Sequence, residues 1–268
     1  MNWIIFQLHF LTEHTLDFTY ILAGATVGFI VGLTGVGGGS LMTPILVLGF
    51  HIQPTIAVGT DLLYAALTKT GGMWTHNRLN NINWKIVKGL SIGSIPGSIS
   101  TIILVKYFNI SGEDFEQIIS MTLGIMLIIT ALVIIFKKQI SRLTQSKSRG
   151  EPKQATLILL GLTLGILVTI SSVGAGAVGG ALLLLLYPKL KARTIIGTDI
   201  AHAVPLTAVA GLGHLQLGHI DFQLLLSLII GSLPAIYFGA IIGEKIHEDV
   251  LKTLVALILL VIGLKFIL

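Results

Sequence analysis

Apolar stretches and short polar breaks alternate along the whole chain. Ten such stretches are present, five on each side of a polar, basic segment at residues 137–153. A helix needs about 20 apolar residues to cross the hydrocarbon core of a bilayer. Eight stretches reach that length, namely 16–36, 55–75, 84–107, 115–136, 155–173, 194–213, 222–243 and 250–268. The other two, 39–50 and 177–188, hold only twelve residues each and directly follow Gly-rich runs. The pattern therefore predicts eight spanning helices and two short segments that either span or re-enter.

The two halves of the chain are related by an internal repeat. A shift of 138 positions aligns residues 59–97 with residues 197–235 without a gap. The aligned pairs include Gly59-Thr60-Asp61 with Gly197-Thr198-Asp199, His76 with His214, and Pro96 with Pro234. Apolar composition alone would not match Asp, His and Pro together. Because five segments is an odd number, the second half starts on the opposite side of the membrane, so we expect inverted repeats, which are typical of secondary transporters.

These patterns predict the fold class and its division. We expect an all-α polytopic membrane protein with two inverted-topology repeats of five segments each. Each repeat has four spanning helices plus one short broken or re-entrant half-helix. Residues 1–136 form the first repeat, 137–153 a linker and 154–268 the second repeat. Since basic loops face the cytoplasm, the linker is predicted to be cytoplasmic and both termini extracytoplasmic, in a multi-pass protein of the cytoplasmic membrane.

Composition supports the membrane assignment. Apolar residues make up 53% of the chain and charged residues 11%, against about 25% charged residues in a soluble domain. The mean hydropathy is +0.92, which excludes a soluble enzyme and a disordered chain. There is no Cys, so a disulfide framework or a thiolate metal site is not possible. The net charge of +5 comes mostly from short loops, which indicates membrane orientation rather than binding of nucleic acid.

Two Gly-rich runs, at residues 32–40 and 171–180, mark the expected substrate site. Irregular backbone inside a membrane is tolerated only where it is buried or lines a cavity. The half-helix after each run begins with free N–H groups and a partial positive charge, which suits an anion. The predicted substrate-binding residues are Thr34, Gly35, Gly37, Gly38, Gly39, Ser40, Ser171, Ser172, Gly174 and Gly176, with Thr60 and Thr198 beside them. The alternative is that the runs only allow close packing of helices.

Ionisable residues inside the apolar stretches are the second group of candidates. A charged side chain at the bilayer centre costs about 2.5–3.5 kcal/mol on insertion scales, so Asp61 and Asp199 are predicted to bind a coupling proton or cation. Alternatively, each is an N-cap that follows a helix break at Gly59 or Gly197. His202 lies one turn after Asp199 and either shares a proton with it or is a buried neutral His.

Lys69 stands apart from this symmetric set. It lies two turns after Asp61, and its repeat mate is Thr207. It is either a counter-ion for the substrate or an anchor at the membrane interface, and its place near the inner end of its helix favours the anchor.

The motifs as a group resemble one family. GLTGVGGGSLMTP at 32–44, SSVGAGAVGG at 171–180, and GTD at 59–61 and at 197–199 are similar to those of the TauE/SafE proteins, the sulfite exporter or toluene sulfonate uptake permease family. The resemblance covers nearly the whole chain. It implies a permease or exporter for small sulfur-containing anions such as sulfite, organosulfonates or thiosulfate.

The residues and the resemblance together predict a secondary transporter, not an enzyme, that moves a small sulfur-containing anion by alternating access. Asp61, Asp199 and His202 would couple this movement to protons, and no cofactor, metal or nucleic acid is expected. A transporter of divalent cations and a passive anion channel stay open as alternatives. A membrane enzyme is disfavoured, because Arg occurs only at predicted loops or helix ends, at positions 78, 142, 149 and 193. The direction of transport, the coupling ion and the oligomeric state are open at this point.

Overall fold

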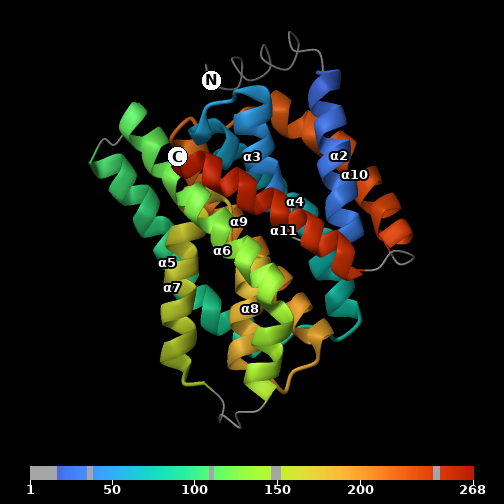
Figure 1. The fold of residues 1–268 in the computed structure, drawn as a ribbon. Coiled ribbons are helices and arrows are strands. Elements are labelled where there is room, and N and C mark those ends of the chain that lie inside the picture. The colour runs from blue at the N-terminus through green and yellow to red at the C-terminus, as the bar shows by residue number, and fades with distance from the viewer. Residues whose placement is uncertain (1–16, 35–38, 109–111, 146–151, 244–247) are drawn as a thin grey trace.

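The regular elements of the protein are helices. The computed structural model describes residues 17–34, 39–108, 112–145, 152–243 and 248–268, and no strand occurs in these ranges (Figure 1). The helices are α2 (Phe18–Thr34), α3 (Gly39–Phe50), α4 (Pro54–Arg78), α5 (Trp84–Tyr107), α6 (Glu113–Gln145), α7 (Gln154–Ser171), α8 (Ala177–Leu186), α9 (Ala192–Gln216), α10 (Phe222–Gly243) and α11 (Glu248–Ile267). The predicted all-α polytopic membrane fold is confirmed.

The helix lengths follow the apolar pattern with two differences: fewer helices than the predicted eight qualify as membrane spans in the part of the chain that the structure describes, and one helix is longer than predicted. Five helices, α5, α6, α7, α9 and α10, are long and apolar enough to cross a membrane within the described ranges. Of the other predicted spans, α2 has only 17 residues and α4 carries Asp61 and Lys69 within its 25 residues. The short segments appear as helices of 12 residues in α3 and 10 residues in α8. The second difference is α6, which continues to Gln145, into the range assigned to the linker, because Gly and Pro are absent until Gly150 and Pro152.

Helices from the two halves pair with one another. α2 packs along α10, α5 along α7, α4 along α9 and α6 along α11, so each pair takes one helix from each half (Figure 1). In the view of Figure 1, α6 and α11 cross the front of the molecule. The two halves therefore interlock and do not form separate bodies.

The same close contacts occur twice. In α2, a methyl group added at Gly24 or Gly28 would overlap the backbone of α10, and in α7 one added at Gly161 or Gly165 would overlap the backbone of α5. The facing residues are Leu228 and Ser232 in α10, and Leu90 and Ser94 in α5. Since the repeat shift of 138 relates Leu90 to Leu228 and Ser94 to Ser232, the contacts support the duplication. The orientation of the halves relative to a membrane stays a prediction.

Burial separates the centre of the bundle from its outside. Asp61 and Asp199 are buried in the N-terminal halves of α4 and α9. The outer helices expose large apolar side chains, among them Met121, Ile125 and Ile129 of α6, Leu233 and Tyr237 of α10, and Leu257 and Val261 of α11. Apolar surface on that scale suits contact with lipid.

Candidate functional site

The second Gly-rich run breaks the helical path as predicted. α7 ends at Ser171, and Ser172 follows in the left-handed conformation with φ 57°. Gly174 and Gly176 then take φ angles of 118° and 151°, which L side chains rarely adopt. α8 begins directly afterwards, and its first turn is closed by the N–H of Gly180, which donates to the carbonyl of Gly176 at 2.8 Å. Val178 and Gly179 in this first turn are buried, so the half-helix begins inside the bundle.

The first run is described at its two ends. α2 ends at Thr34 and α3 begins at Gly39, while the predicted substrate residues Gly35, Gly37 and Gly38 lie outside the described residues. Thr34 donates to the carbonyl of Ile30 at 2.7 Å, and Ser40 is buried. The two helices thus flank the run where a break was predicted.

Asp61 connects the short helix α3 with the break before α8. Its Oδ2 accepts hydrogen bonds from Thr43 of α3 at 2.5 Å and from Ser172, directly after α7, at 2.9 Å. The carboxylate is fully buried, and its Oδ1 has no hydrogen-bond partner. Because it lies inside α4, eight positions from Gln53, the N-cap residue, the N-cap interpretation is wrong. Asp61 instead ties α4 to the short helix α3 and to the break before α8.

Asp199 lies in different surroundings. It is 5% exposed, and its Oδ1 is buried without a hydrogen-bond partner. The carboxylate lies against the first turn of α8, where a methyl group added at Gly179 would overlap Oδ1. The N-terminus of a helix favours a negative charge. Asp199 is also inside its helix, because α9 begins at Ala192, so the N-cap interpretation fails here too.

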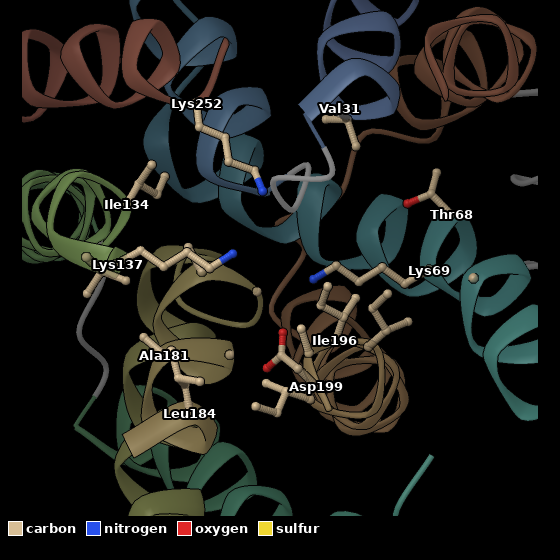
Figure 2. A pocket seen from close by; sticks show the side chains of 18 of the residues that line it. Val31, Thr68, Lys69, Ile134, Lys137, Ala181, Leu184, Ile196, Asp199 and Lys252 are labelled. Carbon is tan, nitrogen blue, oxygen red and sulfur yellow. The ribbon is translucent and has the colours of Figure 1, made fainter. Parts of the chain in front are cut away.

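A cavity of about 320 Å³ opens beside Asp199. Figure 2 shows Lys69, Lys137 and Lys252 directing their amino groups into it, with the Asp199 carboxylate beside them. The start of α8 forms another side, through Gly176, Ala177, Gly180 and Ala181. Among the described residues that line the cavity, three are cationic and one is anionic. Its charge and the adjoining helix N-terminus both favour an anion.

Lys69 takes a defined position at the break. Its Nζ donates to the carbonyl of Ala175 at 2.6 Å, inside the segment that joins α7 to α8. The side chain is partly buried and lines the cavity with Asp199. The anchor interpretation is therefore wrong, and the residue lies where a counter-ion for a substrate would be needed.

Lys137 and Lys252 are the site residues that the sequence did not reveal. Lys137 falls in the predicted cytoplasmic linker, and Lys252 falls near the start of the predicted span 250–268. The structure places Lys137 within the extended α6 and Lys252 in the first turns of α11, and these two helices pack together. The absence of Gly and Pro after residue 136 was the available signal for Lys137, whereas no signal in the sequence connects Lys252 with the site.

Several predicted residues do not line the cavity. Thr60 accepts a hydrogen bond from the N–H of Asp221 at 3.1 Å, and Thr198 accepts one from the N–H of Asn83 at 2.9 Å. These two contacts are related by the repeat shift of 138. Of the predicted substrate residues that the structure describes, Gly176 borders the cavity. Thr34, Ser40, Ser171, Ser172 and Gly174 lie beside or within the Gly-rich runs. Thr60 and Thr198 form contacts between helices.

The hydrogen bond of His202 supports the interpretation as a buried neutral histidine rather than a residue that shares a proton with Asp199. Its Nε2 lies 2.9 Å from the Oγ of Ser94 in α5, and the ring is buried. His202 thus joins α9 to α5 as a buried, hydrogen-bonded ring.

Two further histidines meet at the end of α9. His214 Nε2 lies 2.9 Å from the carbonyl of Thr169, and its Nδ1 lies 3.3 Å from Nδ1 of His219. The turn at Gly218 (φ 78°) brings the second ring back, and burial lowers the pKa of His219. Over the described residues, no group of three His, Cys, Asp or Glu side chains is placed to hold a metal ion.

A helical bundle with a helix broken at a Gly-rich run, buried carboxylates and a cationic cavity has the architecture of a polytopic membrane transporter. The family model of the sulfite exporter TauE/SafE matches residues 20–266. The chain therefore belongs to the TauE/SafE family.

Relatives in two organisms carry corresponding names. The chain is 39% identical over 251 residues to the probable membrane transporter protein YjnA of Bacillus subtilis, covering 92% of this chain and 98% of that protein. It is 28% identical to the probable membrane transporter protein YdhB of the same bacterium, over 91% and 97% of the two chains. It is 27% identical to the probable membrane transporter protein MJ0441 of Methanocaldococcus jannaschii, over 92% and 94%. No solved structure matches the chain. The family and these names indicate a membrane transporter rather than an enzyme.

Proposed function

We propose that this membrane transporter moves a small sulfur-containing anion, such as sulfite, an organosulfonate or thiosulfate, across the cytoplasmic membrane by alternating access. The observation that carries the proposal is the cavity, where Lys69, Lys137 and Lys252 surround the start of α8. The family description supports the sulfur anion. The single carboxylate among the described lining residues argues against a divalent cation, which prefers several oxygen ligands.

The start of α8 and Lys69 supply the donors that such an anion needs. A sulfite or sulfonate group presents three acceptor oxygens, which must exchange water for protein donors when they enter the bundle. The N-terminus of a helix contributes about 0.3–1 kcal/mol when exposed and up to about 2 kcal/mol when partly buried. The Nζ of Lys69, now 2.6 Å from the carbonyl of Ala175, adds a charged donor. Binding of moderate strength follows, which allows release at the end of each cycle.

Of the three residues predicted to couple transport to protons, we assign proton binding to Asp199. It lines the cavity with Lys69, so an anion held by this lysine would place a second negative charge near the carboxylate. A proton on Asp199 removes that repulsion and so travels with the anion. Asp61 accepts two hydrogen bonds away from the cavity lining, and we assign it to holding α3 against the break before α8.

The packing also defines which helices move as units. Because α2 pairs with α10 and α5 pairs with α7, separating the two halves of the sequence would break the closest contacts of the bundle. Alternating access therefore moves pairs that contain a helix from each half, around the central helices α4 and α9.

Uptake by purified protein in liposomes tests this function. With an inward proton gradient, labelled sulfite and sulfoacetate should accumulate, and Lys69→Gln should abolish accumulation. Lys88→Gln is the matched control, because Lys88 is an exposed residue of α5 away from the cavity. Asp199→Asn should keep exchange of anions while losing the response to the gradient. Accumulation of divalent cations alone, or normal anion uptake by Lys69→Gln, would contradict the proposal.

A further inference from the structure

Asp61 is a buried carboxylate that meets no positively charged partner. Its side chain is fully buried, and its Oδ1 has no hydrogen-bond partner. Lys69 lies two turns further along α4, but its Nζ donates to the carbonyl of Ala175 at 2.6 Å and it lines the cavity with Asp199. Among the described residues, the partners of the Asp61 carboxylate are two hydroxyl groups and no cation. A buried charge inside a membrane bundle needs an opposite charge beside it.

The surroundings of Asp61 supply oxygen atoms from three elements of the bundle. Thr43 of α3 and Ser172, directly after α7, donate to Oδ2 at 2.5 Å and 2.9 Å. Both side chains are buried, and each hydroxyl oxygen keeps lone pairs that can face a cation. The Oδ1 of Asp61 adds a charged acceptor that no donor occupies. One carboxylate with several neutral oxygen atoms is a ligand set that suits a monovalent cation.

The end of α7 adds a partial negative charge at the same place. Its last helical hydrogen bond runs from the N–H of Ser172 to the carbonyl of Val168 at 2.8 Å. The next N–H, that of Val173, donates to the Oγ of Ser171 at 3.2 Å. The carbonyl groups of the last turn therefore lie beyond the hydrogen bonds of the helix, and such an end favours a positive charge.

The two ends of this break thus favour ions of opposite sign. The start of α8 borders the cavity and faces Asp199, whereas the end of α7 faces Asp61 through Ser172. Broken helices of transporters direct their N-termini at anionic groups and use the carbonyl groups of the break for Na⁺. The geometry around Asp61 corresponds to the second of these arrangements.

We propose that Asp61, Thr43 and Ser172, together with carbonyl groups at the end of α7, bind one sodium ion. Its single charge neutralises the carboxylate, whereas a divalent cation would leave an excess positive charge in the bundle. The site is separate from the cavity, whose lining does not include these three residues. The inference goes beyond the proposed function, because sodium binding does not depend on which anion is transported.

Thermal unfolding of the purified protein in detergent tests the site. A ligand that binds only the folded state raises the melting temperature as its concentration rises. Choline chloride is replaced stepwise by sodium chloride at constant total salt, so that screening stays the same. The melting temperature should rise by about 3–6 °C when sodium reaches ten times its Kd. Choline is too large to enter between the three oxygen-bearing side chains.

Variants connect the sodium effect with the named residues. Asp61→Asn keeps the size of the side chain and one acceptor oxygen but removes the charge, so it should abolish the rise. Asp199→Asn, the same change at the repeat mate, should keep it.

Two milder variants keep the test decisive if Asp61→Asn does not fold. Thr43→Val and Ser172→Ala each remove one oxygen atom and should raise the sodium Kd by about tenfold. Ser227→Ala is their control, because Ser227 is also buried and its Oγ has no hydrogen-bond partner. It should leave the sodium Kd unchanged within about twofold.

Two results would overturn the sodium site. They are equal melting temperatures of the wild-type protein in sodium and in choline, and a sodium effect of full size in Asp61→Asn or in both hydroxyl variants. A melting temperature that follows pH at Asp61 and ignores sodium would assign the carboxylate to a proton instead. The liposome assay decides the transport function separately. Anion uptake without a sodium effect would keep that function and remove the ion, whereas a sodium effect without uptake would do the reverse.

Discussion

Asp61 and Asp199 occupy equivalent positions of the two repeats and have different surroundings. Asp61 accepts hydrogen bonds from Thr43 and Ser172, while Asp199 faces the first turn of α8 and the cavity. The neighbours explain the difference. With the one-residue slip that aligns Gly35 with Gly174, Thr43 corresponds to Leu182. Leucine cannot donate a hydrogen bond, so Asp199 lacks the partner that Thr43 provides to Asp61. The two carboxylates therefore occupy equivalent positions in the sequence repeat but have different surroundings in the structure.

The residues next to these carboxylates, in contrast, make equivalent contacts in the two repeats. Gly59 lies against His219 and His214, and Gly197 lies against Asn81 and His76. These contacts correspond under the shift of 138, as do the hydrogen bonds of Thr60 and Thr198. Within two residues of the carboxylates, the contacts between the halves are thus the same in both repeats. The packing between the two halves is thus symmetric, whereas the cavity lies beside only one of the two carboxylates.

The largest expected effect tests this symmetric packing. Gly59→Ala and Gly197→Ala should each lower the stability by about 3 kcal/mol, or prevent folding, because the added methyl group meets a backbone carbonyl that cannot move aside. Gly71→Ala is the control, since nothing lies within 4 Å of its new methyl group. It should raise stability by about 0.5–1 kcal/mol through its helix preference. Thermal unfolding in detergent measures the stability of all three variants. A clear difference between Gly59→Ala and Gly197→Ala would show that the two contacts are not equivalent.

A smaller effect separates the two carboxylates. Asp61→Ala removes the acceptor of two buried hydroxyl groups and should lower the stability by about 1–3 kcal/mol. Asp199→Ala removes a carboxylate whose Oδ1 has no hydrogen-bond partner, so its stability should equal or exceed that of the wild type. The same unfolding assay compares them, and equal losses in both variants would mean that the carboxylates have similar roles after all.

The smallest effect lies in the two threonines. Thr60→Val and Thr198→Val each leave one backbone N–H without its acceptor and should cost about 0.5–1.5 kcal/mol, equally in both. Anion binding should persist in both variants, since neither residue lines the cavity. Loss of anion binding by these folded variants would instead support the prediction from the sequence that Thr60 and Thr198 bind the substrate.

Much of the local structure could be predicted from the sequence. The two short helices and the break before α8 follow from apolar length and from Gly, both of which act over a few residues. The buried positions of Asp61 and Asp199 follow in the same way from their place within apolar stretches. Thr43 as the partner of Asp61 was not predictable, because this contact depends on how α3 packs against α4. The role of Lys69 was misjudged for the same reason, since its partner Ala175 lies in the other half.

The sequence by itself determined the helices, the break before α8, the duplication and the family, because each depends on residues that are close together or on motifs that can be aligned. The tertiary structure decided that every main helix pair draws one member from each half. It also decided that Lys137 and Lys252 reach the same cavity as Lys69. A charge near a helix end has the same local pattern whether it faces water or a cavity, and only the packing of the helices around it determines which of the two it meets.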